Sequence, residues 1–147
     1  MMAELKHYKT IAVEHFIDTN VFVYAQDSSN PVKCARALVL LESLSKEGGI
    51  AISTQVLQEF ANVAVRKLGL RLPEVNALLD ELNKLTTFSV DIATIKDAVT
   101  IHFAHRLSFF DSLIIATASR NGCLFVYSED MADGQTIKGL TIVNPFS

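Results

Sequence analysis

The chain has 147 residues, 50% of them hydrophobic, and its 13 basic and 16 acidic side chains give a net charge of −3. This length suits one domain with its own core, and the composition excludes intrinsic disorder and collagen-like or low-complexity structure. Apolar runs such as 37–41 fall far short of the ~18 residues that a membrane span requires, and we expect neither a membrane segment nor a secretory signal. Two isolated cysteines, Cys34 and Cys123, fit a reduced cytoplasmic protein without a disulfide framework or a zinc site.

Short strands alternate with helices along the chain. Residues 1–12 show no clean period and are expected to form a loose lead-in. The predicted elements are then, in chain order, a strand at 13–18, a helix from Asn30-Pro31 to Gly48-Gly49, a strand at 50–53, helices at 54–68 and from Pro73 to about 85, a strand at 86–90, helices at about 92–105 and from Ser108 to Asn121-Gly122, and strands at 123–127 and 141–143. Asn and Pro begin helices and glycine ends them, while an apolar run such as 123–127 is typical of a strand buried on both faces.

Five strands separated by helices predict right-handed crossovers between parallel strands. The expected fold is a single α/β domain over residues 13–147, a Rossmann-like three-layer arrangement of a parallel five-stranded sheet with helices on both faces. Ligands of such sheets bind beyond the carboxyl ends of the strands. Asp18 ends the first strand and Asp130 follows the fourth, so two acids at one edge of the sheet suggest a metal site.

Each acidic residue also has an ordinary structural explanation. Asp18 would form an Asx turn at the end of its strand, and Asp130 would cap a short turn. Asp111 lies three residues after Ser108, which is the spacing of a capping box at the start of a helix. Glu59 lies on the polar side of its helix together with Gln55, Asn62 and Arg66. The default interpretation of such a side is a face exposed to solvent. Taken singly, none of these acids identifies a site.

Other candidate sites have weaker support. His102 and His105 lie three residues apart on a predicted helix and could face one metal, but a partly exposed helix end is the more common reason for such a pair. Cys123 begins a buried strand, where an inert packed thiol is expected. The chain contains neither the glycine-rich phosphate-binding motifs nor the nucleophile-elbow motif of other enzyme classes.

Four segments in order resemble the four motifs of the PIN domain. Residues 16–21 (FIDTNV) resemble the first motif, 56–60 (VLQEF) the second, 110–118 (FDSLIIATA) the third and 127–131 (YSEDM) the fourth. The resemblance covers residues 16–146, nearly the whole chain. It is strongest to the toxin nucleases of bacterial toxin–antitoxin pairs, the virulence-associated protein C type, and it implies a PIN-like α/β fold.

The resemblance also implies roles for individual residues. The family's catalytic, metal-binding acids fall on Asp18, Glu59, Asp111 and Asp130. The fourth of these has two competitors, the adjacent Glu129 and the nearby Asp133. Asn20 would position Asp18 more than bind metal, and Ser128 matches a hydroxyl position behind the metal ligands.

Clustered carboxylates repel each other strongly, so we expect them to surround a cation. Hard oxygen ligands suit Mg²⁺ or Mn²⁺, and one or two such ions can activate water and hold a phosphate oxygen. The resemblance therefore implies a metal-dependent endoribonuclease that hydrolyses RNA and leaves a 5′-phosphate. The metal would also offset the repulsion between an acidic protein and an anionic substrate. The candidates for holding the flanking phosphates are Lys33, Arg36, Arg66, Lys67 and Arg106.

The implied setting is a cytoplasmic toxin that is silenced by an antitoxin protein and forms a homodimer. Two other interpretations compete with this one. A haloacid-dehalogenase-type phosphatase also begins with an aspartate at a strand end, but it needs a second aspartate where this chain has Asn20. A catalytically inactive PIN-like module that binds RNA or protein would lack one or more of the four acids, and this chain has all four.

Overall fold

Strands and helices alternate through residues 13–147, the part of the chain that the computed structural model describes. In chain order they are β1 (His15–Ile17), α2 (Thr19–Ala25), α3 (Pro31–Lys46), β2 (Ile50–Ser53), α4 (Thr54–Arg66), α5 (Leu72–Leu82), β3 (Thr86–Phe88), α6 (Ile92–His105), α7 (Phe109–Arg120), β4 (Phe125–Tyr127), β5 (Thr136–Ile137) and β6 (Leu140–Val143). The expected lead-in at 1–12 lies outside the described residues. Within the described range, no helix is both long and apolar enough to cross a membrane.

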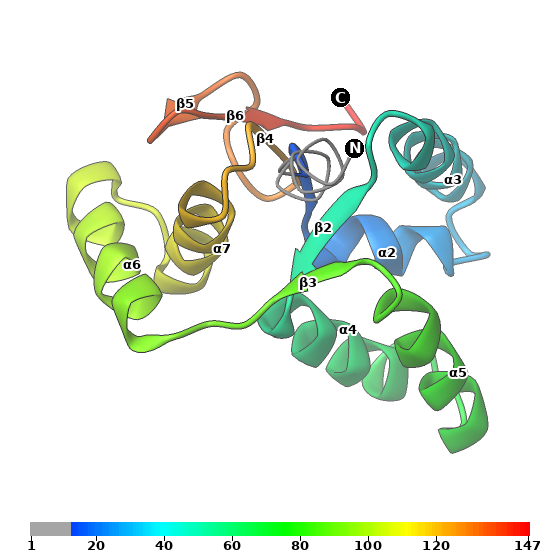
Figure 1. The fold of residues 1–147 in the computed structure, drawn as a ribbon. Helices are drawn as coiled ribbons and strands as arrows, with labels where there is room; N and C mark the ends of the chain where they lie inside the picture. Colours follow the sequence, from blue (N-terminus) through cyan, green and yellow to red (C-terminus); the bar gives the residue numbers. More distant parts are fainter. Residues whose placement is uncertain (1–12) are drawn as a thin grey trace, which may run out of the picture.

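The strands form one sheet with the order β3-β2-β1-β4-β6-β5. All neighbouring strands are parallel except β5 and β6, which pair in the antiparallel sense. In Figure 1, α6 and α7 lie on one side of the strands, and α2 and α3 lie on the other. The predicted α/β class, with a mostly parallel sheet between helices, is therefore confirmed.

Within residues 13–147 the sheet has six strands, one more than the sequence predicted. The additional strand, β5, has only two residues and forms a hairpin with β6 through Lys138 and Gly139. Both turn residues have a positive φ, 51° and 80°. A Lys-Gly pair lacks the Asn-Gly or Asp-Gly signature of a tight hairpin, so the sequence pattern did not reveal this turn.

The helix α2 was not predicted either, because a turn was expected after β1. Its residues (TNVFVYA) are mostly β-branched or aromatic and have low helix propensity. Asp18 nevertheless caps the helix, since its carboxylate accepts a hydrogen bond from the Thr19 N–H at 2.7 Å. Val21 and Phe22 bury their side chains in the core. Tertiary packing thus overrides local propensity and makes the segment after Asp18 helical.

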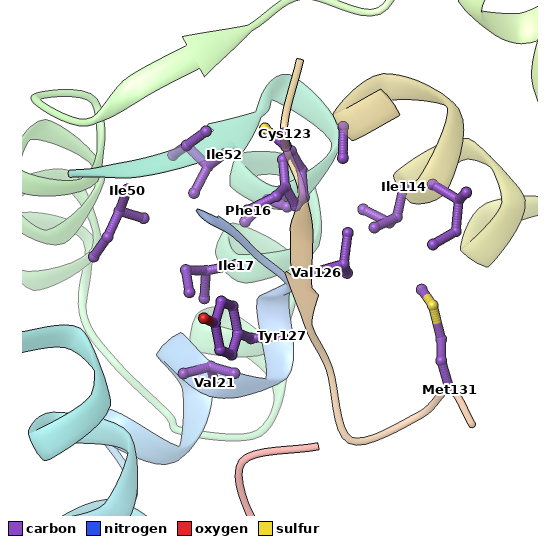
Figure 2. Close-up of a cluster of buried hydrophobic side chains, with 14 of the residues drawn as sticks. Phe16, Ile17, Val21, Ile50, Ile52, Ile114, Cys123, Val126, Tyr127 and Met131 are labelled. Atoms are coloured by element: carbon purple, nitrogen blue, oxygen red, sulfur yellow. The ribbon is translucent and has the colours of Figure 1, made fainter. Parts of the chain in front are cut away.

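The core lies around the central strands β1 and β4. Phe16 and Val126 have no exposed surface. Figure 2 shows Ile114 of α7 and Val21 of α2 approaching these strands from different sides. Truncating a buried Phe to Ala typically costs ~3–5 kcal/mol, so a strand packed in this way is held firmly. Asp18, which directly follows β1, therefore has a well-defined place at the edge of the sheet.

Candidate metal centre

The parallel strands place four acidic residues at one edge of the sheet. Asp18 directly follows β1, and Asp130 comes shortly after β4, which pairs with β1. Glu59 lies in α4, which begins directly after β2, the strand on the other side of β1. Asp111 lies in the first turn of α7. The topology thus gathers acids that are widely separated in the sequence.

Asp18 is the most deeply buried of these acids, with 5% of its surface exposed. Its carboxylate accepts hydrogen bonds from the Thr19 N–H at 2.7 Å and from the Ser128 hydroxyl at 2.8 Å. The pKa of Asp18 rises from its ordinary 3.8 to about 6, mainly because burial disfavours the charged form. The two hydrogen bonds oppose this rise, and the carboxylates of Glu59 and Asp111 add to it. Its negative charge is therefore costly unless a cation accompanies it.

Glu59 is held by side chains from the first turns of α2 and α4. The Thr19 hydroxyl donates to Oε2 at 3.0 Å, and Nε2 of Gln55 donates to Oε1 at 2.9 Å. Nε2 of Gln55 also donates to the backbone carbonyl of Phe110 at 3.1 Å, which links α4 to the start of α7. The expectation that Gln55 lies on a solvated helix face is wrong, because the approach of α7 buries its side chain.

The other end of the Gln55 amide is unsatisfied. Its Oε1 is buried and has no hydrogen-bond partner among the residues that the structure describes. The amide orientation is fixed, because both partners of Nε2 are oxygen acceptors and exchanging O for N would set oxygen against oxygen. A buried acceptor of this kind calls for a donor or a cation. The Nε2 end of the same amide faces Glu59, so this acceptor lies close to one of the four acids.

Asp111 lies in α7, which begins as predicted after Ser108. The Ser108 hydroxyl caps this helix by accepting the Asp111 N–H at 3.1 Å. The pKa of Asp111 is raised, mainly by partial burial. A hydrogen bond with Ser108 opposes the rise, and the charges of Asp130 and Glu59 add to it. Asp18 interacts in the same way with Glu59 and Asp111. The charges of all four acids are therefore electrostatically connected.

Asn20 connects the acids that follow β1 and β4. Its Nδ2 donates to Oδ2 of Asp130 at 3.0 Å and to Oγ of Ser128 at 3.4 Å, and Ser128 in turn donates to Asp18. We predicted that Asn20 would position Asp18, but it reaches Asp18 only through Ser128. The reason is the unpredicted helix α2, because its first turn directs the Asn20 side chain toward the segment after β4.

The two competitors of Asp130 have partners elsewhere. Glu129 accepts two hydrogen bonds at 2.9 Å from Nζ of Lys33. Asp133 is exposed and accepts a backbone N–H near the end of the chain at 2.8 Å. In contrast, the charge of Asp130 raises the pKa of Asp111. Asp130 also has a partner, Asn20, but of the three candidates it is the one whose charge acts on Asp111.

A cleft of about 500 Å³ adjoins the acids and runs between α2 and α4. Glu59 and Asp130 line it at the acidic edge of the sheet, and Tyr24, Asn62 and Lys67 line it farther along the two helices. Its volume falls within the ~300–1,000 Å³ typical of small-ligand pockets. The acids thus border a cavity that could admit part of a substrate.

The four acids form a charged region and not a closed coordination shell. Among residues 13–147, no three His, Cys, Asp or Glu side chains lie close enough to share one ion. His102 and His105 lie in the last turn of α6, where Nδ1 of His102 forms a hydrogen bond with the carbonyl of Leu107, which fits their interpretation as a helix end. Burial raises the pKa of Cys123 to about 12, as befits an inert thiol.

The sequence also matches a known protein family. The family model described as the PIN domain matches residues 15–132. The chain therefore belongs to the PIN domain family, and the resemblance inferred from its four motifs is confirmed. A curated relative, Ribonuclease VapC23 from Mycobacterium tuberculosis, is 31% identical over 109 residues, which cover 73% of this chain and 85% of that protein.

Solved structures with this fold include a toxin and a toxin–antitoxin complex. A toxin–antitoxin complex from Klebsiella pneumoniae contains a chain with a TM-score of 0.69 and 19% identity, covering 90% of this chain and 98% of that one. VapC20 from Mycobacterium tuberculosis, a sarcin–ricin loop cleaving toxin, has a TM-score of 0.64 and 17% identity, covering 77% and 87%. VapBC2 from Rickettsia felis, bound to a promoter DNA fragment, has a TM-score of 0.64 and 21% identity, covering 87% and 96%. These likenesses establish the fold.

Proposed function

We propose that this protein is a metal-dependent endoribonuclease whose catalytic acids are Asp18, Glu59, Asp111 and Asp130, and that it is the toxin of a toxin–antitoxin pair. The observation that carries the proposal is the buried Asp18, whose pKa is raised by burial and by two neighbouring carboxylates. Perturbed acids of this kind in a cleft are typical of functional sites. The relative that is 31% identical is named a ribonuclease, which supports RNA as the substrate.

The residues at this edge fit a hard divalent cation such as Mg²⁺ or Mn²⁺. Four carboxylates and the unsatisfied Oε1 of Gln55 offer only oxygen ligands, which these ions prefer. When bound, the ion would activate water and offset the negative charge of the phosphate. Because the acids are not yet within reach of one ion, their side chains would have to turn toward it.

The chain's own side chains hold the acids in place. Ser128 donates a hydrogen bond to Asp18, and Asn20 donates one to Asp130 and one to Ser128, so these bonds keep the acids after β1 and β4 close to each other. Two further side chains do the same for Glu59. Asp18 holds a proton below a pH of about 6, and cation binding would compete with that proton. Metal affinity is therefore expected to rise with pH through this range.

A toxin of this kind would act in the cytoplasm and be neutralised by a separate antitoxin. The solved neighbours include toxin–antitoxin assemblies from Klebsiella pneumoniae and Rickettsia felis, which supports a protein partner. We also propose a homodimer, because α6 leaves Ile92, Val99 and Phe103 exposed along one stripe that a second copy could cover. Sedimentation of the wild type and of Phe103→Glu tests this, since the variant should be monomeric.

Cleavage of a mixed RNA pool tests the enzymatic proposal. The wild type should cut RNA with Mn²⁺ or Mg²⁺, leave 5′-phosphate ends and stop cutting when EDTA is added. Asp18→Asn or Asp111→Asn should lower the rate at least ~100-fold, beyond the loss typical of residues that only support a metal ligand. Asp80→Asn, which changes an exposed acid on α5, is the matched control and should keep the wild-type rate. A wild type that binds RNA but never cuts it would instead establish the alternative, an inactive PIN-like binding module.

A further inference from the structure

The segment that follows β4 carries Asp130 but has little support from its backbone. β4 ends at Tyr127, and the N–H of Ser128 still donates a hydrogen bond to the carbonyl of Val143 at 3.0 Å. Beyond that point, no hydrogen bond between backbone groups of residues 13–147 involves residues 129–131. The place of Asp130 therefore depends on the bonds that the side chains of this segment make.

The side chain of Glu129 links this segment to α3. Its two carboxylate oxygens accept hydrogen bonds at 2.9 Å from Nζ of Lys33, and the Tyr24 hydroxyl donates to Oε1 at 3.1 Å. The side chains of Lys33 and Glu129 are 32% and 26% exposed, whereas those of Lys46 and Glu42, a pair within α3, are 74% and 72% exposed. Fully solvated ion pairs contribute little. The more shielded pair is the one that can hold a segment in place.

Two aromatic rings fix the ammonium group of Lys33. Its Nζ lies 4.7 Å from the centre of the Tyr24 ring and 5.6 Å from that of Phe146, and it donates to the Tyr24 hydroxyl at 3.2 Å. Phe146 belongs to the C-terminal segment, which lies beside α3 in Figure 1, and its carbonyl accepts a hydrogen bond from Arg36 at 3.0 Å. Such rings attract a cation. Lys33 is thus already engaged, which argues against the phosphate contact considered for it from the sequence.

We infer that Lys33 is a positioning residue of the metal centre, an inference that rests on the proposed metal-dependent function. By binding Glu129, it holds the segment after β4 so that the next side chain, Asp130, stays beside Asn20 and the other acids. Without this ion pair, ion binding would also have to order the segment, which costs conformational entropy. The affinity for the metal therefore depends on a lysine that forms no salt bridge with any of the four acids among residues 13–147.

Calorimetric titration with Mn²⁺, in the absence of RNA, tests the inference. Lys33→Met removes the ammonium group and keeps a side chain of similar length. It should weaken Mn²⁺ binding ~10-fold, the loss typical of groups that orient metal ligands. Lys33→Arg can still pair with the carboxylate and stack on the rings, so it should restore most of the affinity. The direction is informative, because the loss of a positive charge near acids would by itself strengthen cation binding.

A double-mutant cycle shows whether Lys33 acts through Glu129. Glu129→Ala should also weaken Mn²⁺ binding ~10-fold, and the variant that combines it with Lys33→Met should bind no more weakly than either single variant. Independent effects would instead multiply to ~100-fold. Lys46→Met removes an exposed lysine that pairs with Glu42 on the same helix, and this matched control should bind Mn²⁺ like the wild type. Unchanged affinity in Lys33→Met, or losses that multiply in the combined variant, would overturn the inference.

RNA cleavage separates the positioning role from a direct contact with a phosphate. At a Mn²⁺ concentration equal to the wild-type dissociation constant, Lys33→Met should cut RNA about 5-fold more slowly than the wild type, because less of it holds the ion. Excess Mn²⁺ should restore the rate, and the KM for RNA should not change. If Lys33 held a phosphate, its loss would raise KM and reduce the salt dependence of RNA binding at every Mn²⁺ concentration. That result would contradict the inference.

The wild type distinguishes a failure of this inference from a failure of the proposed function. A wild type that binds no Mn²⁺ refutes the metal centre and the inference together. If the wild type binds Mn²⁺ and cuts RNA, and Lys33→Met binds Mn²⁺ equally well, the proposed function stands and only the positioning role is refuted. Mn²⁺ binding that depends on Lys33 in a chain that cuts no RNA would support the inference and refute the proposed ribonuclease.

Discussion

Replacing Asp18 by asparagine tests the acidic site directly, because the substitution removes a charge and preserves the shape of the side chain. In the structure Asp18 also caps α2, accepting the Thr19 N–H at 2.7 Å. Asparagine is as good a cap as aspartate, so the start of the helix should be retained. Without divalent ions, we therefore expect Asp18→Asn to be more stable than the wild type at neutral pH.

The size of the effect follows from the pKa of Asp18, which is about 6 in the folded chain against an ordinary 3.8. At about 1.4 kcal/mol for each pH unit, the ionised carboxylate costs the fold about 3 kcal/mol. Because the folded chain binds the proton more tightly than the unfolded chain, this cost is absent below pH 3.8, grows between 3.8 and about 6, and is complete above that range. Asparagine faces Ser128 with an amide instead of a carboxylate, and this change costs part of the stability gained by removing the charge. The net gain in the free energy of unfolding is about 1–2 kcal/mol.

Melting curves of the two proteins provide the assay. In EDTA at about pH 7.5, the variant should melt about 3–6 °C higher than the wild type. Near pH 4, where Asp18 is largely protonated and the cost of the amide remains, the order should reverse and the variant should melt slightly lower. Mn²⁺ at ~100 times its dissociation constant should stabilise the wild type by about 2.7 kcal/mol and the variant by much less. Asp80→Asn, an exposed acid on α5, should follow the wild type in every condition. A variant that is less stable at both pH values, with equal Mn²⁺ shifts in both proteins, would refute the metal site and leave Asp18 as a cap alone.

Three further tests address other parts of the site. Asp130→Asn should lower RNA cleavage at least ~100-fold while Asp133→Asn keeps the wild-type rate, and the reverse result would move the fourth acid to Asp133. Gln55→Leu should weaken Mn²⁺ binding ~10-fold in calorimetry without removing a carboxylate, and unchanged affinity would show that the buried Oε1 faces no ion or bound water. The double variant His102→Ala with His105→Ala should cleave RNA within a few-fold of the wild type, whereas complete loss would place these histidines in the site.

Much of the fold follows from patterns that depend on neighbouring residues alone. Apolar runs of strand length, Asn and Ser caps and terminating glycines predicted the alternation of strands and helices, although β1 and β4 each begin two residues later than expected. Parallel crossovers then required the strand ends to meet at one edge. That rule was sufficient to bring Asp18 and Asp130 to the same side of the sheet.

The features that the sequence did not reveal depend on contacts between distant elements. Helix α2 consists mostly of poor helix formers and is stabilised by the burial of Val21 and Phe22, which no local pattern records. Gln55 is buried only because α7 lies close enough for a hydrogen bond to the carbonyl of Phe110. Asn20 turns toward Asp130 only because α2 is a helix. The orientation of the supporting side chains therefore needed the tertiary structure.

The structural explanation of each acid and its proposed role as a metal ligand are compatible, and they differ in what they require of the charge. As a cap, Asp18 contributes about 1 kcal/mol, and asparagine or serine would contribute as much without a buried charge. As an ionised carboxylate with 5% of its surface exposed, beside Glu59 and Asp111, it costs the fold more than the cap returns. Capping therefore accounts for the position of Asp18 but not for its charge. A cation at this edge of the sheet would compensate that charge, and the same cation would allow a chain with a net charge of −3 to hold a phosphate.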